Sequence, residues 1–115
     1  MKWLALFLLG LFVVSPILGR YYIQQPLKVG QSSVAYFTVR NDMRYDINDA
    51  KVELYIYSLG LSFRSIEKDI PGKDHALFRM GISVPRWVEP GEYFSRITVG
   101  NDRKKDVEYS YLRIV

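Results

Sequence analysis

Hydrophobic and polar residues alternate along almost the whole chain after Tyr21. In the clearest segment, 75–84, Ala76, Phe78, Met80, Ile82 and Val84 alternate with Leu77, Arg79, Gly81 and Ser83. A period of two places successive side chains on opposite faces of a β-strand. Similar segments, rich in Val, Ile, Tyr, Phe and Thr, lie at 22–27, 33–41, 50–58, 61–68, 92–100 and 106–115. The alternation predicts seven strands and no helix of useful length.

Turn signals separate these segments. They are Val29-Gly30, Pro71-Gly72 and Pro90-Gly91, pairs in which glycine or proline favours a reversal of the chain. Seven short strands within about 100 residues are typical of an immunoglobulin-like β-sandwich. The sequence therefore predicts an all-β, seven-stranded sandwich over residues 20–115, with a small barrel as the alternative.

Three strands carry irregular features. Pro26 places the first strand at a sheet edge, because proline has no N–H to donate to a neighbour. Segment 61–68 is weak, and we expect Phe63 and Ile66 to anchor it. In the last segment the apolar set moves from Val107, Tyr109 and Tyr111 to Leu112 and Ile114, which predicts a bulge or a buried end.

The first 19 residues have the plan of a secretory signal. Lys2 is followed by an uncharged apolar run over 3–14, then by Pro16 as a breaker and a small residue, Gly19. We expect export to the cell envelope or the extracellular space, with cleavage after Gly19. An uncleaved membrane anchor is the alternative, since residues 3–19 approach the length of a membrane span.

Composition excludes several classes of function. The chain contains 16 Lys and Arg against 12 Asp and Glu, and these charges are interspersed, which argues against nucleic-acid binding. It contains no Cys, so disulfides, thiolate nucleophiles and cysteine-based zinc sites are excluded. The single histidine, His75 beside Asp74, has no second His, Cys or G-x-S-x-G motif to complete a nucleophilic site. We expect no enzyme activity and no catalytic residue.

The order of short motifs resembles that of a known group of modules. An Asn follows a V-x-V strand at Asn41, Pro71-Gly72 precedes the strongest strand, and Val84-Pro85 followed by Pro90-Gly91-Glu92-Tyr93 leads into the next. This pattern resembles the immunoglobulin-like modules of microbial, especially archaeal, surface proteins in the CARDB and NEW3 groups. The resemblance implies the sandwich architecture and hardly bears on activity. Tyr93 stands where sandwich domains often place a tyrosine corner, with its hydroxyl bonded to nearby backbone.

Polar loops are expected to meet at one end of the sandwich. Segments 41–49, 69–74 and 101–106 supply carboxylate and amide oxygens of the kind that calcium uses, but without the spacing of an EF-hand. We therefore expect polar turns capped by Asn and Asp side chains and no cofactor, with calcium at this end as the alternative.

The candidate binding residues lie on the outward face of two strands. If Val52, Leu54 and Ile56 point inward, alternation sends Tyr55 and Tyr57 outward. The same reasoning sends Phe94 and Arg96 outward on segment 92–100, which neighbours segment 50–58 in the immunoglobulin arrangement.

Exposed aromatic residues beside arginine are typical of protein-binding patches and of sugar-binding platforms, although cross-strand aromatic pairs also stabilise a sheet without any ligand. We expect a noncatalytic module whose partner is another envelope or surface protein, with a glycan or a second copy joined by strand addition as alternatives. Trp87 would either extend the contact or cover the sandwich end, and the membrane would be met only through the N-terminal segment.

Overall fold

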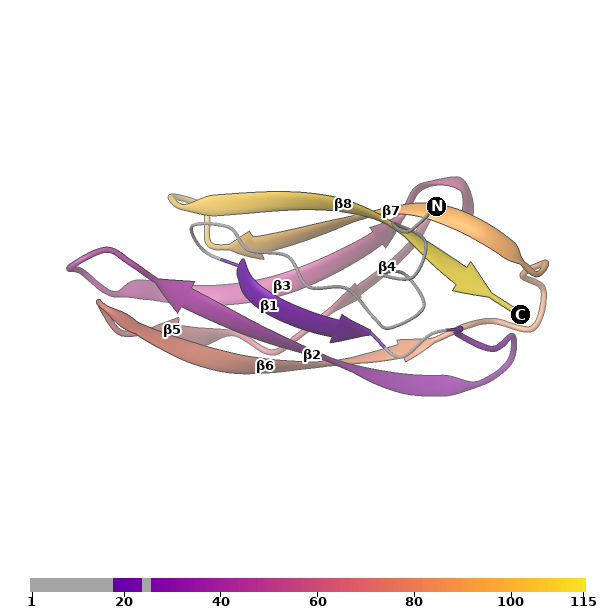
Figure 1. Ribbon diagram of the computed structural model, residues 1–115, viewed down its shortest axis with the longest axis horizontal. Coiled ribbons are helices and arrows are strands. Elements are labelled where there is room, and N and C mark those ends of the chain that lie inside the picture. The colour runs from indigo at the N-terminus through magenta and orange to yellow at the C-terminus, as the bar shows by residue number, and fades with distance from the viewer. Residues whose placement is uncertain (1–17, 24–25) are drawn as a thin grey trace, which may run out of the picture.

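The chain folds as two antiparallel β-sheets that face each other. The computed structural model describes residues 18–23 and 26–115, with side chains from Tyr21 onward. The three-stranded sheet contains β1 (Leu18–Ile23), β2 (Ser32–Asn41) and β6 (Asp74–Ser83) in that order. The five-stranded sheet has the order β4 (Leu61–Arg64), β3 (Ile47–Ile56), β7 (Gly91–Gly100), β8 (Lys105–Ile114), and β5 (Lys68–Ile70) also pairs with β3. Figure 1 shows the two layers, which confirm the predicted sandwich.

Alternating side chains from both sheets form the core. Phe37 and Phe78 from the three-stranded sheet are fully buried, as are Leu54 and Ile97 from the five-stranded sheet. The predicted inward set of β3, Val52, Leu54 and Ile56, is buried, and of the alternating apolar residues in segment 75–84 only Ala76 remains half-buried. The sequence period therefore identified most of the core correctly, because one face of each strand has to exclude water.

The first strand lies earlier than predicted. β1 ends at Ile23 and pairs with β2 at the edge of the three-stranded sheet, so the edge position is confirmed. Leu27 belongs to the other sheet: its N–H donates to the carbonyl of Arg113 at 2.9 Å, and Val115 N–H donates back to its carbonyl at 2.8 Å. Pro26 lies just before this change of sheet, where a missing N–H costs no ladder bond.

The weak segment 61–68 forms two strands, so the described residues contain eight strands rather than seven. β4 and β5 both pair with β3, and Ser65 between them is buried, with its hydroxyl oxygen accepting the N–H of Val52 at 3.0 Å. Phe63 packs against the core, as predicted. Ile66 does not: it is 71% exposed, because it follows the buried Ser65 and therefore points to the opposite side.

Of the two alternatives predicted for the last strand, the bulge is absent and the buried end is present, since Leu112 and Ile114 are buried. β7 and β8 pair in continuous register from Gly91 opposite Ile114 to Gly100 opposite Lys105. Val107, Tyr109 and Tyr111 all point outward, whereas Ser110, Leu112 and Ile114 point inward. The apolar set looked displaced because the inward positions at the start of β8 are Asp106 and Glu108, which are polar and half-buried.

The predicted export signal lies almost wholly outside the described residues. β1 begins at Leu18 and so includes the last two residues of that predicted segment, and the boundary at residue 19 stays a prediction. Among residues 18–23 and 26–115, no helix is long and apolar enough to cross a membrane.

Candidate functional site

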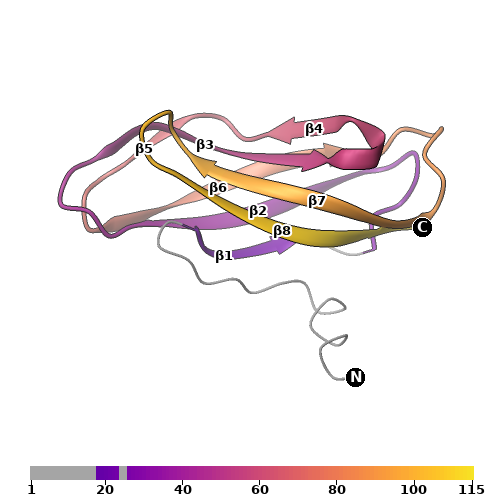
Figure 2. The ribbon, with the colours of Figure 1, turned by 90° about the horizontal axis from the view of Figure 1, so that it is seen from above.

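The predicted binding residues lie together on the outer surface of the five-stranded sheet. β3 and β7 are neighbours, as expected, and Tyr55 stands directly opposite Arg96. On the other side of β7, Arg96 stands opposite Tyr109 and Phe94 stands opposite Tyr111. Figure 2 looks onto this sheet, where β4, β3, β7 and β8 follow one another. We call the group Tyr55, Tyr57, Phe94, Arg96, Tyr109 and Tyr111 the aromatic face.

Ring contacts join four elements of the aromatic face: β3, the 3₁₀ helix η1 (Tyr57–Leu59) that follows it, β7 and β8. Phe94 is at the centre: its ring stacks with that of Tyr57 at a centroid distance of 5.6 Å and with that of Tyr109 at 5.6 Å, the latter pair within 2° of parallel. Tyr111 lies tilted against Phe94 at 5.2 Å, and Tyr55 meets Tyr57 edge-on at 5.1 Å. Despite these contacts, Phe94 remains 40% exposed and Tyr109 56% exposed.

Arg96 is held within the aromatic face by two tyrosines. Its guanidinium carbon lies 5.4 Å from the ring centroid of Tyr55 and 5.6 Å from that of Tyr57, within the range of cation–π attraction. Nη1 of Arg96 donates to the hydroxyl of Tyr57 at 3.3 Å. The side chain is half-buried, and its Nε is covered without a hydrogen-bond partner among the described residues.

Two members of the aromatic face, Tyr109 and Tyr111, were not in the predicted site. In the sequence they belonged to an apolar set that appeared to change sides along segment 106–115, so they were not assigned to an outward face. Their spacing of two, continued back to Val107, was the signal that they share one face. Trp87 is 63% exposed in the loop before β7, whereas the next residue, Val88, is buried and covers that end of the core.

Tyr93 has the structural role that was predicted for it. The ring is half-buried and packs against the core, and its hydroxyl donates to the carbonyl of Glu89 four residues earlier. This bond fixes the loop that leads into β7, directly beside Phe94.

The polar loops meet at one end of the sandwich, as predicted. Asp46 Oδ1 accepts the N–H of Gly72 at 3.0 Å, and Asp69 Oδ1 accepts the N–H of Asp49 at 2.9 Å. A cleft of about 790 Å³ opens at this end between segments 45–51 and 101–104, and its lining includes basic as well as acidic side chains: Tyr45, Asp46, Ile47, Asn48, Asp49, Lys51, Glu67, Asn101, Asp102, Arg103 and Lys104. Among the described residues, no three His, Asp or Glu side chains gather in a way that could hold a metal ion.

Asn41 organises this end, a role that the sequence reading did not assign. It is 1% exposed, and its Nδ2 donates to the carbonyls of Tyr45, Ile70 and Pro71 at 2.8, 3.0 and 3.2 Å. Its Oδ1 accepts the N–H of Met43 at 2.9 Å. The amide thus fastens two loops to the end of β2. The Asn after a V-x-V strand was visible in the sequence, but not its partners.

His75 and Asp74 lie at the start of β6 and are both exposed. Nδ1 of His75 is 3.5 Å from Asp74 Oδ1, and the same oxygen accepts the backbone N–H of His75 at 2.8 Å. The Asp74 carboxylate therefore accepts a backbone N–H at the start of β6, and His75 is an exposed residue at that end of the strand.

The inner side of β8 carries two groups with shifted pKa values. Burial raises the pKa of Tyr21 to about 12, and a nearby carboxylate, Glu108, adds to the rise, while the Ser110 hydroxyl opposes it. Burial also raises the pKa of Glu108, with a further contribution from Asp106. These groups lie between the sheets and not on the aromatic face.

Comparisons with known proteins identify the fold. No protein-family model and no curated protein sequence matches the chain. The solution structure of the CARDB domain of PF1109 from Pyrococcus furiosus aligns with a TM-score of 0.61 and 16% identity, covering 83% of this chain and 90% of that one. The crystal structure of the same domain, in complex with di-metal ions, aligns with a TM-score of 0.59 and 16% identity, covering 77% and 78%.

A third solved structure is of similar size. The C-terminal domain of wzt aligns with a TM-score of 0.59 and 13% identity, covering 85% of this chain and 72% of that one. Some matched chains are much longer, and this chain spans 22% and 27% of two of them. At such identities the comparisons show the fold alone, and they confirm the predicted CARDB-like, immunoglobulin-like architecture.

Proposed function

We propose that this chain, given its CARDB-like fold, is a noncatalytic interaction module of the cell envelope and binds another envelope or surface protein through the aromatic face. The observation that carries the proposal is the contiguous set of five aromatic side chains and one arginine on β3, η1, β7 and β8. Tyr and Arg are enriched in the residues that contribute most to protein–protein binding, and a contiguous exposed apolar patch is a feature of interaction sites.

Ring stacking alone could also stabilise the sheet. Each cross-strand aromatic pair contributes about 0.2–1 kcal/mol to stability without any ligand. However, a cluster that only stabilises the sheet contributes most to stability when its rings are buried. Here four of the five rings stay 40–56% exposed. The remaining exposed area is what a partner would bury.

Ring orientation favours a protein partner over a sugar. A sugar stacks on the open face of an aromatic ring. Phe94 stacks with Tyr57, in η1 after β3, and with Tyr109 on β8, so the faces of its ring are turned toward other rings. We expect the intrinsic fluorescence of the purified domain to stay unchanged on titration with envelope glycans, and a saturable change would move the proposal to carbohydrate binding.

Crosslinking in intact cells tests the proposed function. The full-length chain is tagged, crosslinked in cells of its source organism and recovered for mass analysis, beside the variant Tyr55→Asp plus Phe94→Asp. We expect a specific envelope protein with the wild type and its loss with the variant, because two carboxylates in the centre of the aromatic face oppose burial.

The control is Tyr36→Asp on the outer surface of the three-stranded sheet, where Tyr36 is 42% exposed. It should recover the same protein as the wild type. Recovery of that protein by the double variant, shown to be folded by circular dichroism, would contradict the proposal, and recovery of copies of the chain alone would indicate an assembly subunit.

A further inference from the structure

Arg96 has more hydrogen-bond donors than the protein uses. A guanidinium carries five N–H donors, and the contact with the Tyr57 hydroxyl is made at 3.3 Å, a long distance for such a bond. Nε is buried without an acceptor, and no ion pair within residues 18–23 and 26–115 includes Arg96. A charged donor that is covered but unsatisfied is unfavourable until an acceptor reaches the group.

The carboxylate nearest in register on this surface is already engaged. Glu53 lies two residues before Tyr55 on the same side of β3, and its Oε2 is 3.2 Å from Nη2 of Arg64 on β4. Arg96 instead lies on the central strand, with Tyr55 opposite it on β3 and Tyr109 opposite it on β8. The aromatic face therefore has a fixed, uncompensated positive charge at its centre.

We infer that the partner of the aromatic face places an Asp or Glu carboxylate against Arg96, an inference that rests on the proposed function. Guanidinium groups match carboxylates in shape and charge, and Arg is the cation favoured in interface ion pairs. The rings of Tyr55 and Tyr57 hold the guanidinium in place, which lowers the entropy lost when the pair forms. The partner is thus an acidic protein surface.

A second copy of the chain fits this surface poorly. Two-fold pairing through the centre of the aromatic face would bring two Arg96 side chains near the symmetry axis, with like charges opposed. A net charge of +4 on the chain likewise favours a partner of opposite charge. We therefore expect a different protein at this site.

Charge reversal across the contact tests the inference. A photo-crosslinking amino acid at Thr98, on the outward side of β7 two residues after Arg96, identifies the partner segment that lies over the arginine. In the full-length chain, Arg96→Glu should then reduce capture of that partner about tenfold or more. Replacing the acidic residue of the captured segment with Arg should restore capture by Arg96→Glu and weaken capture by the wild type.

A matched control separates charge at this site from overall charge. Arg79 lies opposite Tyr36 on the outer surface of the three-stranded sheet, so Arg79→Glu makes the same charge change beside another tyrosine, and it should leave capture unchanged. If Arg96→Glu captures the partner as well as the wild type while Tyr55→Asp plus Phe94→Asp does not, the carboxylate inference is wrong and the proposed function stands. If none of these variants changes capture, or no partner is captured, the proposed function fails and the inference with it.

Discussion

Asn41 is the residue on which the polar end of the sandwich most depends. Its buried amide donates to three carbonyls and accepts one N–H, and no water can replace those bonds without entering the core. Asn41→Asp replaces the donor with an acceptor that faces carbonyl oxygens. We expect it to lower the free energy of unfolding by about 3 kcal/mol or more, measured by urea denaturation.

Asn48→Asp is the control for this change, because Asn48 is exposed at the same end of the molecule. It should change stability by less than about 0.5 kcal/mol. Equal effects of the two substitutions would show that Asn41 does not hold the loops as described.

Gly72 is required by a close approach of two loops rather than by an unusual backbone angle. A Cβ at this position would lie 2.3 Å from the carbonyl oxygen of Arg44, a backbone atom that cannot swing aside. Gly72→Ala should therefore lower the melting temperature clearly. Gly81→Ala on β6 has open space around the new methyl group and should leave the melting temperature unchanged or raise it. A similar effect at both positions would contradict the close approach.

The raised pKa of Tyr21 predicts how the free energy of unfolding changes at alkaline pH. Its pKa is about 10 in the unfolded chain and about 12 in the folded protein, so the folded state holds the phenol proton more tightly. The neutral phenol contributes roughly 2–3 kcal/mol to the free energy of unfolding below about pH 10. This contribution is lost as the pH rises from about 10 to about 12. Urea denaturation across this range should show a steeper decline for the wild type than for Tyr21→Phe, and parallel declines would contradict the prediction.

At the scale of the strands, most inward faces, the edge position of β1 and the neighbourhood of β3 and β7 followed from the sequence, and the misses have local causes. A period of two is reliable where successive inward positions are all apolar. This is the case in β6, so its inward set was correct. It failed in β8, where the polar residues Asp106 and Glu108 occupy inward positions near the polar end. The sequence therefore does not show which side of this strand faces the core. The period also failed at Ile66, because a buried Ser65 cannot be recognised without its partner Val52.

The candidate site could be predicted only in part for a related reason. Tyr55, Tyr57, Phe94 and Arg96 followed from alternation within two strands. The spacing of Tyr109 and Tyr111 shows that they share one face, but their position beside Phe94 and Arg96 depends on the register between β7 and β8, which is set by pairing across the sheet.

Stacking across β7 and β8 gives a prediction for these two strands. The rings of Phe94 and Tyr109 are within 2° of parallel at 5.6 Å, so their energies should be coupled. A double-mutant cycle with Phe94→Ala and Tyr109→Ala, followed by urea denaturation, should give a coupling energy of about 0.5–1.5 kcal/mol. Phe94 with Val107, on the same outward side of β8 but opposite Thr98, serves as the control pair and should show weaker coupling. A coupling energy near zero for both pairs would mean that the rings do not stack in solution.

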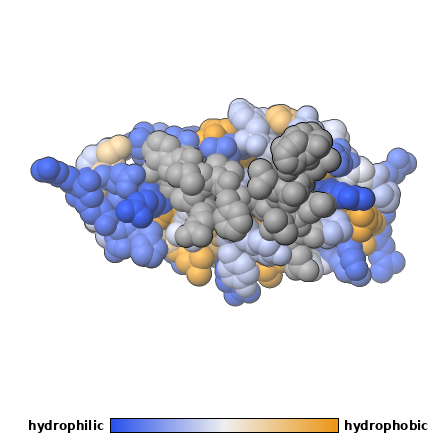
Figure 3. Space-filling view, viewed as in Figure 1, coloured by the Kyte–Doolittle hydropathy of each residue, from blue (hydrophilic) through white to orange (hydrophobic). Residues whose placement is uncertain are grey.

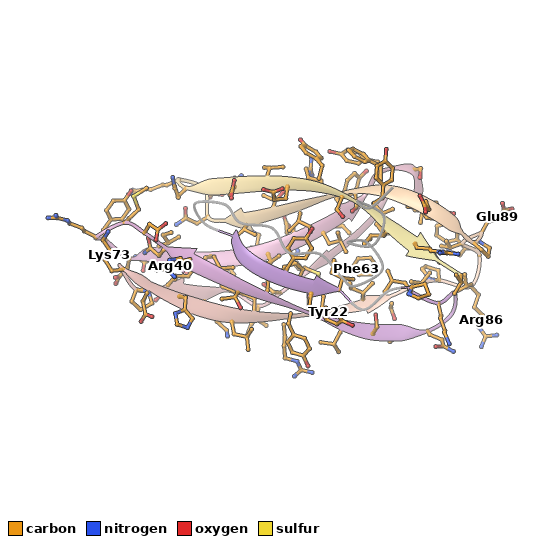
Figure 4. The ribbon with its side chains drawn as sticks, viewed as in Figure 1. Tyr22, Arg40, Phe63, Lys73, Arg86 and Glu89 are labelled. Atoms are coloured by element: carbon orange, nitrogen blue, oxygen red, sulfur yellow. The ribbon has the colours of Figure 1, made fainter. Side chains whose placement is uncertain are left out.

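At the scale of the whole molecule, the charged ends of the sandwich and the aromatic face lie in different places. Lys73 and Arg40 lie at one end and Arg86 and Glu89 at the other (Figure 4), and hydrophilic residues dominate the end that carries Lys73 (Figure 3). The aromatic face lies between these ends, on the outer surface of the larger sheet. A partner could therefore bind the sheet without disturbing the loops that Asn41 fastens.

Oxidative footprinting in intact cells tests the central claim, that the aromatic face is covered by a partner, most directly. Hydroxyl radicals oxidise exposed aromatic side chains, and mass spectrometry compares their labelling in cells with that of the purified protein. We predict strong protection of Phe94, Tyr109 and Tyr111 in cells and unchanged labelling of Tyr36 and Trp87, which are exposed elsewhere. Equal labelling of the aromatic face in both samples would contradict the account.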